Sequence, residues 1–182
     1  MDTLGVVETR TIASGVRLAD EMLKIAEVEL VKASTICSGR YLIFVSGTRS
    51  DVEMAVGHAR LASKLTGSFV ISGISEQLVK VLKKRLPIES GKAIGFVEAS
   101  TVSAGVAAAD VAVKNAGINL VRFVAGLGIC GKSYFIFSGE LASVEEADQI
   151  TKEFLGANYI ESTVLARPEP ELVNAIIGVR ER

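Results

Sequence analysis

The tetrapeptide Gly5-Val6-Val7-Glu8 recurs later in the chain as Gly95-Phe96-Val97-Glu98. The offset of 90 residues holds as far as Val31 and Val121, and 12 of the 27 paired positions are identical. Self-similarity at one fixed offset is the mark of a repeated structural unit. The sequence therefore predicts a duplication, and each copy is to be interpreted with the other beside it.

The duplication continues after a short insertion. The second copy gains two residues near Ala125-Gly126, and the offset of 92 then pairs Gly39-Arg40 with Gly131-Lys132. We expect two homologous domains, residues 1–88 and 93–182, joined by a linker at Pro87–Lys92, where turn-forming residues gather. Two copies of this length do not favour a solenoid.

Each copy has the pattern of an α+β unit, with helices on one face of an antiparallel sheet. In the first copy we expect a helix over 12–26, with one apolar side formed by Ile12, Val16, Ala19, Met22 and Leu23. A second helix over 50–64 is expected to open with a capping box at Ser50–Glu53. The remaining expected elements are strands at 4–8, 28–36, 41–45 and 69–72 and a helix at 76–85.

Composition excludes several classes of protein. The chain has 182 residues, is 49% hydrophobic and has a net charge of −1, so no global field draws it to nucleic acid or anionic lipid. Its longest uncharged stretches, 65–75 and 99–109, fall short of the ~20 apolar residues of a membrane span. The first residues do not resemble a secretion signal, and two cysteines make no disulfide framework, so a reducing cytosol is expected.

Several separate motifs resemble the shell-protein domain of bacterial microcompartments. In the first copy they are Gly5–Thr9, Ala19–Lys24 and Val28–Val31, and in the second Gly95–Glu98 and Ala166–Pro170. Two such domains in one chain are similar to the tandem class, in which a homotrimer forms a pseudo-hexameric disc that tiles into a shell. The resemblance implies a structural protein, not an enzyme, that contacts other shell proteins in a microcompartment within the cytoplasm.

The turn Thr35–Arg40 resembles that of a member of this class whose cysteine binds an iron–sulfur cluster at the pore, which implies the same role for Cys37. In a cyclic trimer, one axial turn presents three copies of its thiol, and three thiolates can ligate three irons of a [4Fe–4S] cluster. The resemblance also implies an encapsulated or cytosolic redox enzyme as partner. Three sulfurs equally suit Zn²⁺, and a free cysteine is commonly only a small buried hydrophobe.

The two equivalent turns are expected to line the central pore, with Ile36, Cys37, Ser38 and Gly39 in the first copy and Gly128, Ile129, Cys130 and Gly131 in the second. When the glycines are aligned, Cys130 pairs with Ser38 and is expected near the same pore. A structural role is expected for it, because six cysteines around one axis would overfill a three-fold cluster site, although a second oxidisable thiol there could be redox-relevant. The run Gly126–Gly131 also satisfies G-x-G-x-x-G. A strand is predicted immediately after it, whereas the dinucleotide fingerprint requires a helix there.

The lateral edge of the disc is assigned by resemblance to Lys24, Lys114 and Arg167. Both lysines also end a predicted helix, where a cation stabilises the C-terminal carbonyls. His58 is expected to be a surface or partly packed residue, because no repeated nucleophile or carboxylate accompanies it.

Two other functions stay open at this point. The tile could provide a pore for small substrates or cofactors that Cys37 merely lines, without a cluster. A ferredoxin-like sensor or enzyme is the third hypothesis, because one fold hosts many functions. The lack of a repeated acid–base constellation in the sequence argues against the third.

Overall fold

The computed structural model describes residues 3–83, 86–87 and 92–177. Both copies of the repeat form an α+β arrangement with a four-stranded sheet, in the orders β2-β3-β1-β4 and β6-β7-β5-β8. The elements of the first copy are β1 (Thr3–Thr9), α1 (Ile12–Ile25), β2 (Glu29–Ile36), β3 (Arg40–Gly47), α2 (Arg49–Ala59), β4 (Leu65–Ser72) and α3 (Glu76–Lys83). Those of the second are β5 (Ala93–Ala99), α4 (Val102–Asn115), β6 (Ile118–Ala125), β7 (Ser133–Gly139), α5 (Leu141–Leu155), β8 (Tyr159–Leu165) and α6 (Pro170–Ile177).

The chain divides into two compact units that differ from the two sequence copies. Unit 1 holds Met1–Ile74 together with two segments of the second copy, Ser100–Ala107 and Ala125–Ser133. Unit 2 holds the other segments, Ser75–Ala99, Ala108–Val124 and Tyr134–Arg182. The start of α4 and the β6–β7 connection therefore pack with the first copy. Most of the predicted linker, residues 88–91, lies outside the described residues.

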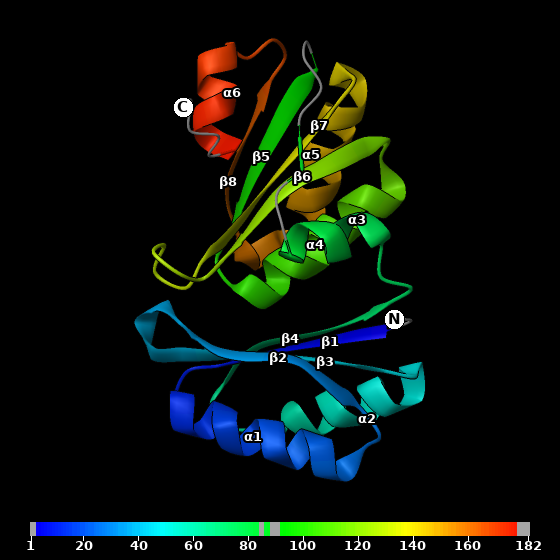
Figure 1. Ribbon diagram of the computed structural model, residues 1–182, viewed down its shortest axis with the longest axis vertical. Helices are drawn as coiled ribbons and strands as arrows, with labels where there is room; N and C mark the ends of the chain where they lie inside the picture. Colours follow the sequence, from blue (N-terminus) through cyan, green and yellow to red (C-terminus); the bar gives the residue numbers. More distant parts are fainter. Residues whose placement is uncertain (1–2, 84–85, 88–91, 178–182) are drawn as a thin grey trace. The chain divides into compact units, whose positions relative to one another are not determined.

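The sheet of unit 1 is antiparallel, and β1 is one of its two inner strands. It pairs with β3, where Gly5 lies opposite Val45, and with β4, where Gly5 lies opposite Val70. Helices α1 and α2 lie side by side on one face of this sheet (Figure 1). The core between them includes Val7, Leu18, Met22, Ile43, Val45, Val52 and Val56. Such apolar burial is the main favourable term in folding.

The predicted apolar side of α1 is partly wrong. Ala19 and Met22 are buried as expected, whereas Ile12, Val16 and Leu23 are exposed. The helix instead turns Gly15, Leu18, Ala19 and Met22 inward. Gly15 decides this orientation, because a Cβ at that position would overlap the Tyr41 side chain on β3. The helix therefore approaches the sheet closely at Gly15, and the side chains of Ile12, Val16 and Leu23 are left outside.

The predicted start and end of the second helix are also wrong. The N-cap is Thr48, whose hydroxyl accepts a hydrogen bond from the Asp51 N–H at 3.3 Å, so Ser50 lies inside the helix. The helix ends at Ala59 and not at Lys64, because the chain must turn there to begin β4 at Leu65. The other expected elements of the first copy are present, with ends shifted by a few residues.

In unit 2, helix α6 packs against the sheet through Val173 and Ile176, which contact the cluster of Ile94, Val121 and Ile136. Gly95 is required at its place in β5, because a Cβ there would overlap the ring of Phe137. No helix among the described residues is long and apolar enough to cross a membrane.

Candidate functional site

The turn that contains Cys37 is a single 3₁₀ turn, Cys37–Gly39, between β2 and β3. Ser38 and Gly39 adopt left-handed backbone conformations, with φ of 67° and 69°. The equivalent residues of the second copy, Cys130 and Gly131, do the same, with φ of 55° and 78°. Non-glycine residues rarely occupy this region. The shared conformation confirms the offset of 92 at the level of the backbone.

Unit 1 brings the two turns together. The Cys37 N–H donates to the Gly126 carbonyl at 3.1 Å, and the Gly128 N–H donates to the Cys37 sulfur at 3.0 Å. The Ser38 hydroxyl donates to the Cys130 carbonyl at 3.3 Å. Cys37 is half-buried and Cys130 is exposed. These bonds fix the position of the Cys37 sulfur relative to the second turn.

The remaining residues of the two turns differ in exposure. Ile36 is buried against Gly126, at which a Cβ would lie 2.7 Å from the Ile36 Cβ. Gly128 is exposed, and Ile129 is half-buried. The G-x-G-x-x-G run leads directly into β7, as the sequence predicted, and not into the helix that a dinucleotide site needs.

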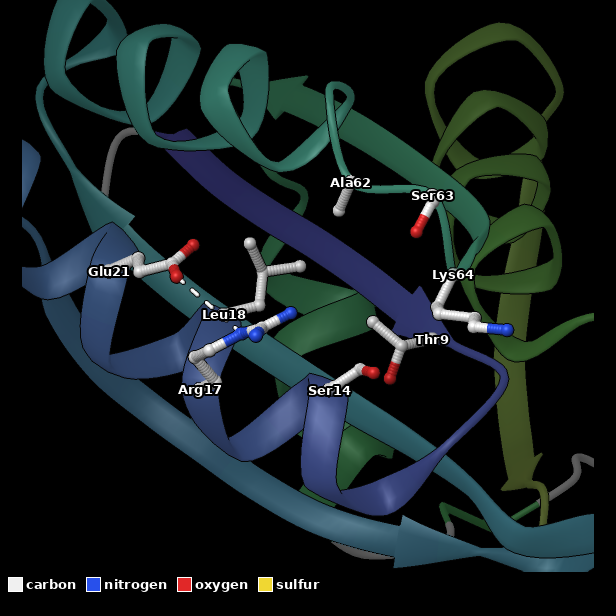
Figure 2. A pocket seen from close by; sticks show the side chains of 8 residues that line it. All are labelled: Thr9, Ser14, Arg17, Leu18, Glu21, Ala62, Ser63 and Lys64. Carbon is white, nitrogen blue, oxygen red and sulfur yellow. Dashed lines mark ion pairs between the residues drawn. The ribbon is translucent and has the colours of Figure 1, made fainter.

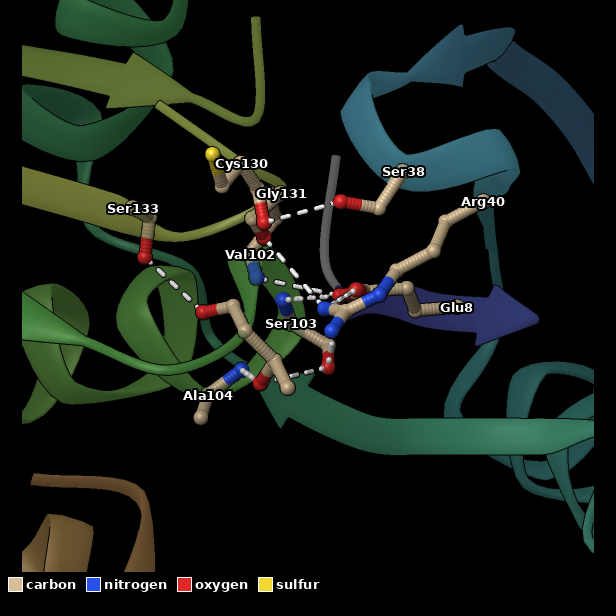
Figure 3. Close-up of polar contacts among 10 residues, drawn as sticks. Glu8, Ser38, Arg40, Val102, Ser103, Ala104, Cys130, Gly131 and Ser133 are labelled. Atoms are coloured by element: carbon tan, nitrogen blue, oxygen red, sulfur yellow. Dashed lines mark hydrogen bonds and ion pairs between the residues drawn. The ribbon is translucent and has the colours of Figure 1, made fainter. Parts of the chain in front are cut away.

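The buried carboxylate of Glu8 is linked to these turns through Arg40, and its role was not predicted from the sequence. Glu8 is fully buried, and its Oε1 accepts a hydrogen bond from Arg40 Nη1 at 2.9 Å. Its Oε2 accepts from the backbone N–H groups of Val102 and Ser103, at 3.0 and 3.2 Å. Figure 3 shows the carboxylate aimed at the start of α4, with Arg40 beside it. Glu8 therefore caps a helix of the other copy, where negative charge is favoured.

The helix end capped by Glu8 is satisfied by further side chains. Thr101 Oγ1 accepts from the Ala104 N–H at 3.2 Å, and the Ser133 hydroxyl donates to the Thr101 carbonyl at 2.8 Å. Arg40 Nη1 lies 3.5 Å from the Gly131 carbonyl and so links the capped helix to the second turn. The recurrence of Glu at 8 and 98 is a sequence feature that points to this network.

The lysines assigned to the lateral edge form ion pairs within their own helices. Lys24 Nζ lies 2.6 Å from Asp20 on α1, and both side chains are exposed. Lys114 pairs with Asp110 on α4, whose carboxylate is buried and also accepts from the Ser75 N–H at 2.8 Å. Arg167 is exposed. His58 Nε2 lies 3.1 Å from the Glu21 carboxylate, so this histidine is partly packed, as expected.

A small pocket lies between α1 and the segment that follows α2 (Figure 2). Its volume is about 50 Å³, and Arg17, Glu21 and Lys64 are among its lining residues. Pockets for organic ligands commonly measure roughly 300–1,000 Å³, so this one accommodates only a few water molecules.

Comparison with known proteins decides the family. The family model of the BMC domain matches residues 3–74 and again residues 93–168. The chain belongs to the BMC-domain family. It is thus a tandem BMC-domain protein, a shell protein of bacterial microcompartments. It localises to the microcompartment shell.

Individual BMC-domain proteins resemble most of the chain. It is 31% identical to the bacterial microcompartment shell protein PduT of Citrobacter freundii over 93% of this chain and 94% of that protein. It is 29% identical to the carboxysome assembly protein CcmO of Synechocystis, covering 81% of this chain and 54% of that one. A crystal structure of a microcompartments protein from Desulfitobacterium hafniense matches with a TM-score of 0.81 at 29% identity, over 96% of this chain and 99% of that one.

Proposed function

We propose that three copies of this chain form a pseudo-hexameric tile of six BMC domains, and that tiles join other shell proteins edge to edge. The duplication supports this, because two domains in each chain and three chains supply six similar units around one axis. Lys24, Lys114 and Arg167 are assigned to the outer edges of the tile. The two turns, with Ile36–Gly39 and Gly128–Gly131, are assigned to its central pore.

The central pore is proposed to hold an iron–sulfur cluster ligated by Cys37 from each of the three chains. Among the described residues no three His, Cys, Asp or Glu side chains of one chain gather into a metal site. The single Cys37 sulfur therefore fits a cluster only if three chains contribute one thiolate each. A [4Fe–4S] cluster accepts three cysteine ligands and leaves its fourth iron open.

The observation that carries this proposal is the hydrogen bond from the Gly128 N–H to the Cys37 sulfur. A backbone amide that donates to a cysteine sulfur holds that sulfur in one position, as an outer-shell contact does for a metal ligand. Hydrogen bonds to cluster sulfurs also tune reduction potential. The bound cluster would transfer single electrons or be delivered to a redox enzyme on either side of the shell.

The test is anaerobic reconstitution with iron and sulfide, followed by absorbance and EPR spectroscopy. The unmodified chain and Cys130→Ser are expected to show cluster spectra, whereas Cys37→Ser is expected to stay colourless. Cys130→Ser is the matched control, because it removes the other thiol at the two turns. An unmodified chain that is colourless and free of iron would overturn the cluster and leave the pore for small molecules.

A further inference from the structure

The first turn of α4 forms a contact between the two BMC domains of one chain. Glu8, from β1 of the first copy, accepts hydrogen bonds from the first N–H groups of α4 in the second copy. Glu8 and the first turn of α4 both belong to unit 1, and the Glu8 side chain is fully buried. We call this contact, in which Glu8 caps the first turn of α4, the joint within the chain. It satisfies the N–H groups at the helix terminus and places negative charge beside the positive end of the helix.

The equivalent helix of the first copy has the same length but an open surface. Val102 and Val106 on α4 are 0% exposed, whereas their counterparts on α1, Ile12 and Val16, are 42% and 52% exposed. The N-cap of α1, Thr11, makes no side-chain hydrogen bond to the helix backbone. Two apolar side chains beside a helix terminus thus lie exposed on α1 where the duplicate positions are covered.

The second copy carries the group that would fit there. Glu98 stands on β5 at the position of Glu8 on β1, and Lys132 stands at the position of Arg40. Glu161 lies directly opposite Glu98 in the sheet, as Gly67 lies opposite Glu8.

Steric fit supports the same match. In the contact between Glu8 and α4 within the chain, a Cβ at Gly67 would lie 2.5 Å from the Ser103 hydroxyl, so a side chain there would displace that hydroxyl. At the equivalent positions of the other copy, the strand carries the larger residue Glu161 in place of Gly67, and the helix carries the smaller residue Ala13 in place of Ser103. In a contact between chains of the same kind, the larger residue on the strand would face the smaller residue on the helix.

We propose that Glu98 of one chain caps α1 of a second copy of this chain by accepting hydrogen bonds from the N–H groups of Ile12 and Ala13. The same contact covers Ile12 and Val16 of that second copy. The inference rests on the proposed trimer, in which three such joints between chains alternate with three Glu8 joints within chains. The interface between chains is a repetition of the interface that already exists inside each chain.

The test compares the association of variants by analytical ultracentrifugation across a concentration series. Val16→Asp places an unpaired charge in each joint and is expected to weaken association at least 100-fold. Glu98→Ala removes the acceptor of two backbone hydrogen bonds and is expected to weaken each joint about ten-fold. Glu98→Gln keeps an oxygen acceptor and is expected to fall between Glu98→Ala and the unmodified chain.

Two controls make the outcome specific. Leu61→Asp changes a side chain that is 83% exposed and outside the joint, and is expected to associate like the unmodified chain. Far-UV circular dichroism checks that every variant is folded. A folded Val16→Asp that forms the same trimer as the unmodified chain would overturn this joint and leave the proposed trimer standing. An unmodified chain that stays monomeric would overturn the trimer itself, and the joint with it.

Discussion

Ser38 and Cys130 occupy equivalent places in the two copies, share a left-handed backbone conformation and are joined by a hydrogen bond from the Ser38 hydroxyl to the Cys130 carbonyl. Each residue precedes a glycine that is also left-handed, Gly39 or Gly131. The turn geometry has thus been kept in both copies while the sequence changed. What differs is the thiol, which precedes the left-handed pair in the first copy and lies within it in the second.

The strained backbone of Cys130 leads to the first prediction. A side chain in the left-handed region costs roughly 1 kcal/mol, and glycine avoids this cost. Cys130→Gly is therefore expected to be about 1 kcal/mol more stable than Cys130→Ala in urea unfolding followed by circular dichroism. The alanine variant is the control, since both lose the thiol. Equal stabilities would mean that the turn relaxes without glycine.

The glycines of the second turn are expected to differ in their tolerance of a side chain. At Gly126 a Cβ would lie 2.7 Å from Ile36, whereas at Gly128 no atom lies within 4 Å. Both residues have positive φ, so each alanine variant carries backbone strain. Gly126→Ala is expected to cost about 3 kcal/mol and Gly128→Ala about 1 kcal/mol. Urea unfolding measures both, and the reverse order would contradict the packing of Ile36.

Removal of the buried carboxylate is expected to be severe. Glu8→Ala leaves the Arg40 guanidinium and the first amides of α4 without their acceptor, at a cost of about 3 kcal/mol. For a chain of this length, the melting temperature falls by roughly 10 °C. Glu53→Ala, which breaks the exposed pair with Arg49, is the matched control and should barely change it. A small effect at Glu8 would mean that water replaces the carboxylate.

The sequence predicted the element order because the duplication allowed each copy to be checked against the other. It predicted the buried side of α1 only in part, since Ala19 and Met22 are buried and Ile12, Val16 and Leu23 are exposed. Ile12 and Val16 fit the helical period of apolar residues. The face that packs on the sheet is instead the one with Gly15, because only a residue without a Cβ lets the helix lie this close to Tyr41. The helix cap was misplaced because Thr48 and Ser50 are both capable caps, and only the path of the chain after β3 selects Thr48.

The candidate site was predictable in part. Alignment of the copies predicted that the turns of Cys37 and Cys130 would lie near each other, and the hydrogen bond between Ser38 and Cys130 confirms their proximity within unit 1. The role of Glu8 was not predictable, since its partners lie 94 and 95 residues away. A carboxylate in a short apolar strand indicates a buried partner but does not identify it.

The most direct test of cluster ligation by three Cys37 thiolates is native mass spectrometry of the chain after anaerobic reconstitution. We expect a trimer that carries the mass of one four-iron cluster, and a Cys37→Ser trimer of the same stoichiometry without that added mass. A trimer that gains no iron and sulfide after reconstitution, or one that keeps a full cluster in the Cys37→Ser variant, would contradict ligation by three symmetry-related Cys37 thiolates.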